Sequence, residues 1–428
     1  MKKIIFIFIT YLCIGLLSHA QDNKESITLD FEAKPSQLVS FYLETEGNVT
    51  IKGLDSIKVD EKGQYTGLMP SSQAGDYEKG RMEIQASRIL CLTLENIMPL
   101  WIDVSLCPSL KKLDLGKLEG AMQEIDLSGL SNLETLRCAK NKLQELVVKD
   151  LKQLKELDCS QNQLTGLDLS NLDKLESVNA TGNKIRSLKL EGLPHLKTLN
   201  LAENPLGKVL KIDLPELLWL KVSRCGLEKL ELVNAPNLEG LECSENKLSS
   251  LDLANANTKI QFLECFLNNI DGTEMGKLIA SLPNWNDSKN PGNGKCYAMS
   301  YGFSPEEPDE NEKNFAYEDD VKKAWDKQWA FMAKTKDGKE VKYAGRPRST
   351  QQIANSEIVI SPNPATDFVS IQGVSPNTEV RILDLSGKLL IESLARSEGV
   401  LNLDVRAIPE GNYLVVINGN SQKLAIIR

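Results

Sequence analysis

The sequence predicts a solenoid of parallel β-strands with few helices, followed by a small antiparallel β-sandwich. Asparagines recur at a fixed step of 21 residues through the middle of the 428-residue chain. The last seventy or so residues instead alternate apolar and polar side chains between turn residues. A fixed period of about 20 to 29 residues indicates stacked repeats, whereas alternation between turns indicates antiparallel strands.

The repeat unit is clearest in residues 154–169, where leucines alternate through a short strand, the chain turns at Asn162, and leucines resume on the return path. This pattern is the leucine-rich repeat. Such strands stack at about 4.8 Å, and their inward side chains form a core that one repeat cannot bury alone. We expect nine strands, with these inward residues: Leu92, Leu113, Leu136, Leu157, Val178, Leu199, Leu220, Leu241 and Leu263.

Two departures from the period leave the local shape of the solenoid open. The repeat between Leu113 and Leu136 is longer than 21 residues. Between Pro205 and Ile212 the leucines of the return path slip by one position.

One turn position is expected to form a ladder along the solenoid. An asparagine side chain carries two donors and an acceptor, and it can satisfy buried backbone groups that the turn removes from the sheet. Cys225 is a weaker substitute at this position. The predicted ladder is Asn141, Asn162, Asn183, Asn204, Cys225, Asn246 and Asn268.

Four cysteines share a second inward strand position: Cys138, Cys159, Cys243 and Cys265. Parallel strands place their thiols side by side and pointing in one direction, which disfavours disulfide geometry. We expect free, packed thiols, with disulfides as the alternative. No histidine accompanies them, so the sequence predicts no metal site and no cofactor.

The outward strand positions predict a binding surface on the concave face. Trp219, Phe262 and Phe266 are expected to be exposed beside charged residues, which is typical of interface anchors. Packing against the C-terminal cap is the alternative for the two phenylalanines. The expected ligand is a protein or a glycan, and the predicted site comprises Trp219, Lys221, Arg137, Asp158, Glu242, Phe262 and Phe266.

Composition argues against catalysis and nucleic-acid binding. The chain has two histidines, of which His19 lies in the predicted signal, so histidine-based catalysis would depend on His195 beside Pro194. The net charge of -9 is spread along the chain, without the basic face of a nucleic-acid binder. We expect a binding protein and not an enzyme, with a structural surface-coat antigen that has no specific ligand as the alternative.

The first twenty residues have the features of a secretory signal. Lys2 and Lys3 precede an apolar run that ends at Ser18-His19-Ala20, a small-residue cleavage site. That run is too short to span a bilayer, and no later run is longer, so no membrane span is expected. The expected division of the chain is residues 1–20 (signal peptide), 21–88 (β-rich cap), 89–283 (repeats), 284–345 (extension and cap), 346–357 (linker) and 358–428 (sandwich).

Helical periodicity in the C-terminal part of the solenoid predicts helices at residues 273–282 and 317–329. A strand is expected at residues 297–301, and a strand pair at residues 330–343.

Two segments resemble known families. Residues 89 to about 283 resemble the 21-residue repeats of internalin-like surface proteins, including the cysteine-ladder type, and similar proteins of the Bacteroidota. Residues 358–428 resemble the type A sorting domain of the type IX secretion system, with an unrelated immunoglobulin-like module as the alternative. The residues that carry this second resemblance are Pro362, Asn363, Pro364, Gly387, Lys388, Gly411, Tyr413 and the terminal segment 423–428.

These resemblances imply a location and a processing route. Export would pass through the type IX machinery, and a sortase would remove the C-terminal domain and attach the protein to a surface polysaccharide. The protein would then be secreted or attached to the outer membrane at the cell surface. The combination of segments resembles the immunoreactive surface antigens of Porphyromonas, which implies adhesion or virulence. Asp55-Ser56-Ile57 resembles a short O-glycosylation pattern, so Ser56 is a candidate O-glycosylation site. A chance match of three residues is the alternative.

Overall fold

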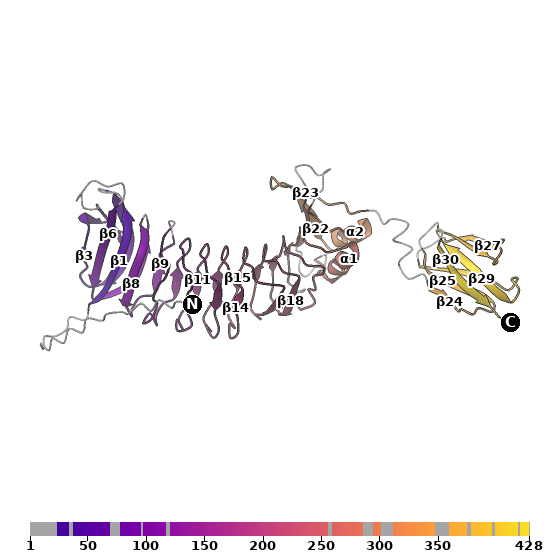
Figure 1. Ribbon diagram of the computed structural model, residues 1–428, viewed down its shortest axis with the longest axis horizontal. Helices are drawn as coiled ribbons and strands as arrows, with labels where there is room; N and C mark the ends of the chain where they lie inside the picture. Colours follow the sequence, from indigo (N-terminus) through magenta and orange to yellow (C-terminus); the bar gives the residue numbers. More distant parts are fainter. Residues whose placement is uncertain are drawn as a thin grey trace, which may run out of the picture.

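The protein folds as a parallel solenoid joined to a small sandwich (Figure 1). The predicted signal peptide and residues 347–357 of the predicted linker lie outside the described residues. The computed structural model describes residues 24–33, 37–68, 78–95, 97–116, 120–255, 259–285, 294–300, 311–346, 359–374, 378–395, 399–417 and 420–427.

A 15-stranded sheet, here called the long sheet, follows the whole length of the solenoid. Its central strands are parallel, and each pairs with the next in register, as in Leu157 opposite Val178. This arrangement confirms the predicted fold class. The central strands are β7 (Arg88–Leu94), β9 (Lys112–Asp114), β10 (Thr135–Arg137), β11 (Glu156–Asp158), β13 (Ser177–Asn179), β15 (Thr198–Asn200), β17 (Trp219–Lys221), β19 (Gly240–Glu242) and β20 (Phe262–Glu264).

The N-terminal end of the solenoid core is covered by antiparallel strands. β2 (Leu38–Glu46), β5 (Gln64–Leu68) and β4 (Asp55–Val59) extend the long sheet. A second sheet packs against this extension, and Phe31 and Phe41 are fully buried between them. The second sheet contains β3 (Thr50–Lys52), β6 (Glu78–Ala86), β1 (Glu25–Ala33) and β8 (Met98–Leu106).

The C-terminal end is closed by two further parallel strands, a hairpin strand and two helices. The strands are β21 (Gly294–Ser300), β22 (Trp329–Lys334) and β23 (Glu340–Lys342), and the helices are α1 (Gly272–Ser281) and α2 (Glu318–Asp326). The prediction of a second helix extending to residue 329 is wrong. Trp329 begins β22 instead, because its indole is fully buried and its Nε1 donates to the carbonyl of Pro283 at 2.9 Å.

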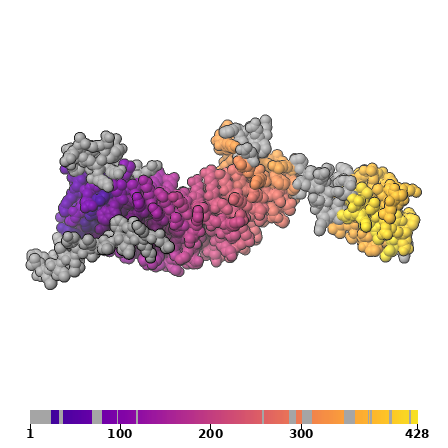
Figure 2. Space-filling model, in the orientation of Figure 1, coloured from indigo at the N-terminus to yellow at the C-terminus, as the bar shows by residue number. Residues whose placement is uncertain are grey.

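The return path of each repeat lies on the other side of the core. Two short sheets form there, one from β12 (Gly166–Asp168) and β14 (Ser187–Lys189), the other from β16 (Val209–Asp213) and β18 (Lys229–Asn234). Figure 2 shows the stacked repeats as an elongated body between the indigo N-terminal strands and the orange C-terminal end.

The turn asparagines bridge consecutive repeats. The Nδ2 of Asn162 donates to the carbonyls of Cys138 and Cys159 at 2.9 and 3.1 Å, and its Oδ1 accepts the N–H of Leu143 at 3.0 Å. Asn183, Asn204, Asn246 and Asn268 make equivalent bonds. The residue before each ladder position adopts positive φ between 53° and 67°, at Lys140, Gln161, Gly182, Glu203, Arg224, Glu245 and Leu267.

Cys225 replaces only part of this bonding. Its Sγ donates to the carbonyl of Leu201 at 3.3 Å, as an asparagine amide would. The N–H of Leu206, in the preceding repeat, bonds instead to the carbonyl of Asn204 at 2.9 Å. The turn around residue 206 therefore lacks the bond to the next repeat that an asparagine Oδ1 accepts elsewhere.

Asn314 is a further ladder residue that the sequence analysis missed. It is fully buried, its Oδ1 accepts the N–H of Ile270 at 2.8 Å, and its Nδ2 donates to the carbonyls of Cys265 and Ala298. The segment containing α1 and β21 separates Asn314 from Asn268, so the 21-residue period cannot reveal it.

The cysteines of the described residues are free and buried, without disulfides. Burial raises the pKa of Cys159 to about 12 and that of Cys138 well above its ordinary value. These thiols therefore stay protonated at neutral pH and pack as small apolar groups.

The C-terminal sandwich has its own core, with Val369, Ile371, Val380 and Val415 fully buried. Neither α1 nor α2, the helices of the described residues, has the length and apolarity to cross a membrane. One sheet of the sandwich contains β24 (Val359–Ser361), β25 (Phe368–Val374) and β28 (Gly399–Asp404), and the other β27 (Leu389–Leu394), β26 (Glu379–Leu383), β29 (Gly411–Ile417) and β30 (Asn420–Ile426).

Asn314→Ala is expected to lower the free energy of unfolding by about 1 to 3 kcal/mol, because it leaves buried backbone groups unpaired. Asn183→Ala should lower the free energy of unfolding by a similar amount. Urea unfolding monitored by circular dichroism measures both. The control is Lys313→Ala, an exposed neighbour expected to change stability by less than about 0.5 kcal/mol. An unchanged midpoint for Asn314→Ala would remove Asn314 from the ladder.

Candidate binding surface

Three aromatic rings adjoin on the outward face of the long sheet. The ring centroids of Trp219 and Phe262 lie 5.7 Å apart, and those of Phe262 and Tyr297 lie 5.6 Å apart. Both separations are within the usual range for interacting aromatic pairs. We call these three residues, from β17, β20 and β21, the aromatic file.

The prediction that Trp219, Phe262 and Phe266 are simply exposed is wrong, because all three are half-buried. Trp219 gains its burial from Gly240 on the neighbouring strand. A Cβ at Gly240 would lie 2.3 Å from two carbons of the indole. The indole therefore lies directly over the backbone of Gly240, where only glycine leaves room for it.

Tyr297 was not among the predicted site residues. Its place in the sequence indicated only a strand, and the parallel pairing of β20 with β21 brings it beside Phe262. The hydroxyl of Tyr297 donates to Glu340 at 2.6 Å, and Lys295 pairs with the same carboxylate at 2.8 Å. Burial raises the pKa of Tyr297, and the hydrogen bond from Lys295 lowers the pKa of Glu340. The phenol therefore stays protonated as a donor, and the carboxylate stays charged.

Phe266 lies at the C-terminal end of this surface. Lys334 places its Nζ 5.7 Å from the centroid of Phe266 and 4.6 Å from that of Tyr297, and it also pairs with Glu264. Phe266 thus contacts a residue of the closing strand β22, which is the packing alternative considered from the sequence.

The charged residues of the predicted site fall into two groups. Lys221 and Glu242 pair at 2.9 Å beside the aromatic file. Arg137 lies on β10, four strands from Trp219 in the order of the long sheet, and pairs with Glu156 at 2.7 Å. Asp158 accepts bonds from the N–H and hydroxyl of Ser160 at 3.1 and 2.6 Å. The structure therefore does not bring Arg137 and Asp158 together with Trp219.

Uncharged polar residues occupy the sheet between these groups. Ser177 and Thr198 on one file, and Asn179 and Asn200 on the next, occupy β13 and β15. The hydroxyl of Thr198 donates to that of Ser177 at 2.7 Å. The outward face thus changes along the solenoid from ion pairs to neutral polar groups and then to aromatic rings.

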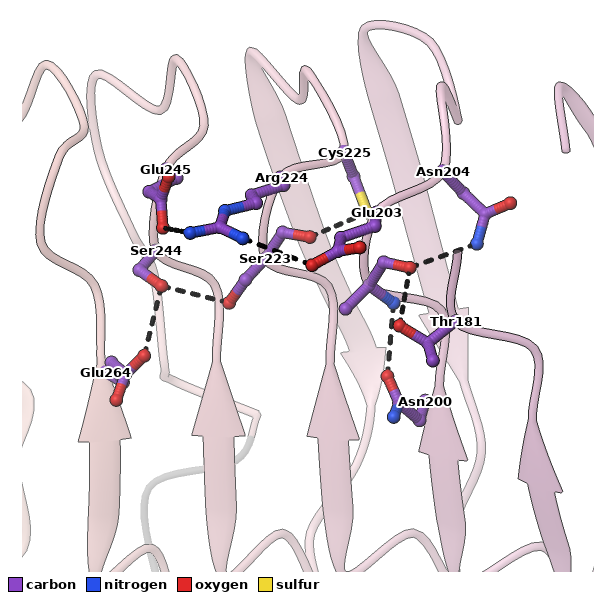
Figure 3. Close-up of polar contacts among 11 residues, drawn as sticks. Thr181, Asn200, Glu203, Asn204, Ser223, Arg224, Cys225, Ser244, Glu245 and Glu264 are labelled. Carbon is purple, nitrogen blue, oxygen red and sulfur yellow. Dashed lines mark hydrogen bonds and ion pairs between the residues drawn. The ribbon is translucent and has the colours of Figure 1, made fainter. Parts of the chain in front are cut away.

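A polar network follows the strand ends along the adjoining edge of the solenoid (Figure 3). Arg224 pairs with Glu203 at 3.1 Å and with Glu245 at 2.8 Å. The hydroxyl of Ser244 donates to Glu264 at 3.1 Å and accepts from that of Ser223 at 3.0 Å. These contacts connect adjacent repeats and pair the charges of this edge.

Ser56, the candidate O-glycosylation site, and His195, the histidine on which histidine-based catalysis would depend, are both exposed. Ser56 lies in β4 with φ of 53°, where the register between β4 and β5 shifts, and its side chain faces solvent. His195 is also exposed, and its Nδ1 lies 3.3 Å from Glu216. Within the described ranges, no three metal-ligating side chains of His, Cys, Asp or Glu gather into a site.

The predicted sorting residues have structural roles in the sandwich. Asn363 lies between Pro362 and Pro364, both of which follow cis peptide bonds. Its Nδ2 donates to the carbonyl of Lys423 at 2.8 Å, and its Oδ1 accepts the N–H of Ala425 at 2.9 Å. The first residues of the domain are thereby held against β30, its last strand.

Two turns of the sandwich use the other predicted residues. Asp384 accepts the N–H groups of Ser386 and Lys388 at 2.8 and 3.0 Å, across a turn in which Gly387 has φ of 86°. The hydroxyl of Tyr413, on the strand that begins at Gly411, donates to the carbonyl of Pro409 at 2.7 Å.

Comparison with known proteins identifies the C-terminal domain. Residues 359–427 match the family described as the secretion system C-terminal sorting domain. This segment is therefore a sorting domain of the type IX system, and the protein is secreted or displayed at the cell surface. No curated protein matches the chain.

Among solved structures, the chain is similar to the functional domain of InlJ from Listeria monocytogenes, which includes a cysteine ladder. The identity is 19%, the TM-score is 0.42, and the match covers 78% of this chain and 65% of that one, less than two thirds. It is also similar to an internalin, InlF, from Listeria monocytogenes. There the identity is 15%, the TM-score is 0.32, and the coverage is 62% of this chain and 84% of the other.

Deleting residues 358–428 is expected to leave the repeats folded but to retain the protein in the periplasm. The two hydrophobic cores share no residue, so the solenoid core stays intact without the sandwich. Cell fractionation and protease treatment of whole cells measure the location. A truncated chain that still reached the surface would show that the sandwich is not needed for export.

Proposed function

We propose that this protein is a surface-displayed binding protein whose ligand is another protein, docked on the aromatic file. The observation that carries the proposal is the contact of two half-buried rings on the outward sheet face, Trp219 and Phe262, with the buried ring of Tyr297 behind Phe262. Adhesion to a partner protein outside the cell is the role that this surface would serve.

The aromatic file has the physical properties of an interface anchor. Trp and Tyr are enriched among the residues that dominate binding energy. The indole of Trp219 is held over Gly240 and against Phe262, so it loses little conformational freedom when a partner covers it. Covering the remaining apolar surface of such a side chain contributes up to about 1.5 to 3 kcal/mol.

The extent of the surface favours a protein partner over a glycan. The accessible rings of Trp219 and Phe262 lie two strand spacings apart, which corresponds to about 10 Å, and half-buried Phe266 continues the apolar surface beyond them. Lys221 and Glu242 lie beside the rings as a paired, half-buried rim, and a polar rim around an apolar centre is typical of protein interfaces. A glycan ligand, or a structural coat protein without a ligand, are the alternatives that the experiment distinguishes.

Trp219→Ala is expected to weaken binding about tenfold or more, because it removes the anchoring indole. Gly240→Ala should weaken binding too, because its Cβ displaces the indole. Immobilised mature protein is first screened against arrays of extracellular proteins and of glycans, and the affinity of each hit is then measured. Trp101→Ala is the control, because Trp101 is a 40% exposed tryptophan of the N-terminal sheet, away from the file.

The outcome of the screen decides between the functions. Protein hits that depend on Trp219 but not on Trp101 would support the proposal. Hits only on the glycan array would reassign the ligand, and an absence of hits on both arrays would favour the structural coat protein. Melting temperatures separate a loss of binding from a loss of folding for each variant.

A further inference from the structure

The return path of the repeat that follows Asn204 is shifted in register by one residue relative to the other repeats. Counted from the ladder asparagine, apolar residues stand at the fifth and seventh positions after Asn183, where they are Leu188 and Leu190. After Asn204 they stand at the sixth and eighth positions, Leu210 and Ile212. Pro205 and Gly207, with φ of 94°, occupy the segment before the shift.

This one-residue register shift explains why the return-path strands form two separate sheets. A one-residue slip turns every side chain of a strand to the opposite face, so regular pairing of β16 with β14 would direct Lys211 into the core. β16 pairs with β18 instead, through a register shift at Ile212 and Asp213. β14 pairs only with β12 among the described strands.

The gap between β14 and β16 uncovers core positions. Leu188 and Leu190 are half-buried, although their counterparts one repeat earlier, Leu167 and Leu169, are 3% and 0% exposed. Leu206 is half-buried too, whereas its counterparts in the other repeats are fully buried. The turn at Leu206 is the one that lacks a bond to the next repeat, because Cys225 replaces the asparagine there.

An open groove of about 830 Å³ occupies this gap. Its apolar lining includes Leu188, Leu190, Leu206 and the exposed Val209, and one strand edge borders it on either side. Arg186 and Glu191 contribute opposite charges to the lining, so the groove does not select for net charge. Its volume lies within the range of about 300 to 1,000 Å³ that is usual for ligand-binding sites.

We propose that this groove binds an extended peptide segment of a partner protein, with apolar side chains at alternate positions. A peptide adds to a sheet when unpaired backbone groups of an edge strand can bond to its own. Because alternate side chains of an extended peptide point to the same side, apolar residues at every second position would lie over the uncovered leucines. The groove lies on the return path, so it is a second site, separate from the aromatic file and independent of its function.

The test uses the mature protein and a fluorescent peptide with the sequence of residues 229–233, Lys-Leu-Glu-Leu-Val. That segment belongs to β18, which pairs with the opposite edge of β16. Fluorescence anisotropy measures its affinity, and hydrogen exchange of residues 187–190 and 208–211 measures backbone protection. We expect saturable binding and slower exchange in both segments. A peptide with proline in place of its first leucine should bind about tenfold more weakly or worse, because proline lacks the N–H.

Two protein variants form a matched pair. Val209 in the groove and Val233 on β18 are each 50% exposed, so neither Val209→Glu nor Val233→Glu disrupts the core. Val209→Glu should weaken peptide binding about tenfold or more, by placing a charge against the apolar side chains. Val233→Glu should leave it unchanged. Equal effects of the two variants, equal affinity for the proline peptide, or an absence of saturable binding would each overturn the proposal.

Discussion

The solenoid depends on the hydrogen bonds of the buried turn asparagines. Most strands of its repeats have three residues, so the sheet alone leaves much of each repeat's backbone without partners. Buried backbone groups need partners, and each ladder asparagine from Asn162 on supplies them in its own repeat and in the one before it, as Asn162 does for Cys159 and Leu143. Asn141, at the start of the ladder, bonds only to the carbonyls of Cys138 and Ala139 in its own repeat among the described residues. The ladder therefore sets both the turn and the stacking of the repeats.

Register along the stack determines what the outward face presents. Identical steps of the repeat place equivalent residues in files, so that Trp219, Gly240 and Phe262 become neighbours. Gly240, which has no side chain, leaves room for the indole of Trp219 to lie over its backbone. Register also explains the opposite side of the coil, where a shift of one residue at Leu210 and Ile212 is enough to separate two sheets.

The proposed binding surfaces and the sorting domain belong to parts of the chain with separate hydrophobic cores. The outward rings and the return-path groove belong to the solenoid, whereas the sorting domain packs around Val369 and Val415. Asn363 connects the first segment of that domain to its last strand, so the sorting residues complete the sandwich and leave the repeats untouched. The solenoid core contains no residue of the sorting domain.

The sequence by itself determined the repeat, the ladder from Asn141 to Asn268 and the matches to a sorting domain, because these depend on local spacing and motifs. Tertiary structure alone decided which distant residues became neighbours. Asn314 joins the ladder and Tyr297 joins Phe262 only after an insertion without the period folds back onto the last repeat. The burial of Trp219 also depends on Gly240 across a strand pair. Periodicity reports the residues that share a position in each repeat, but packing between strands decides how much of each side chain remains exposed.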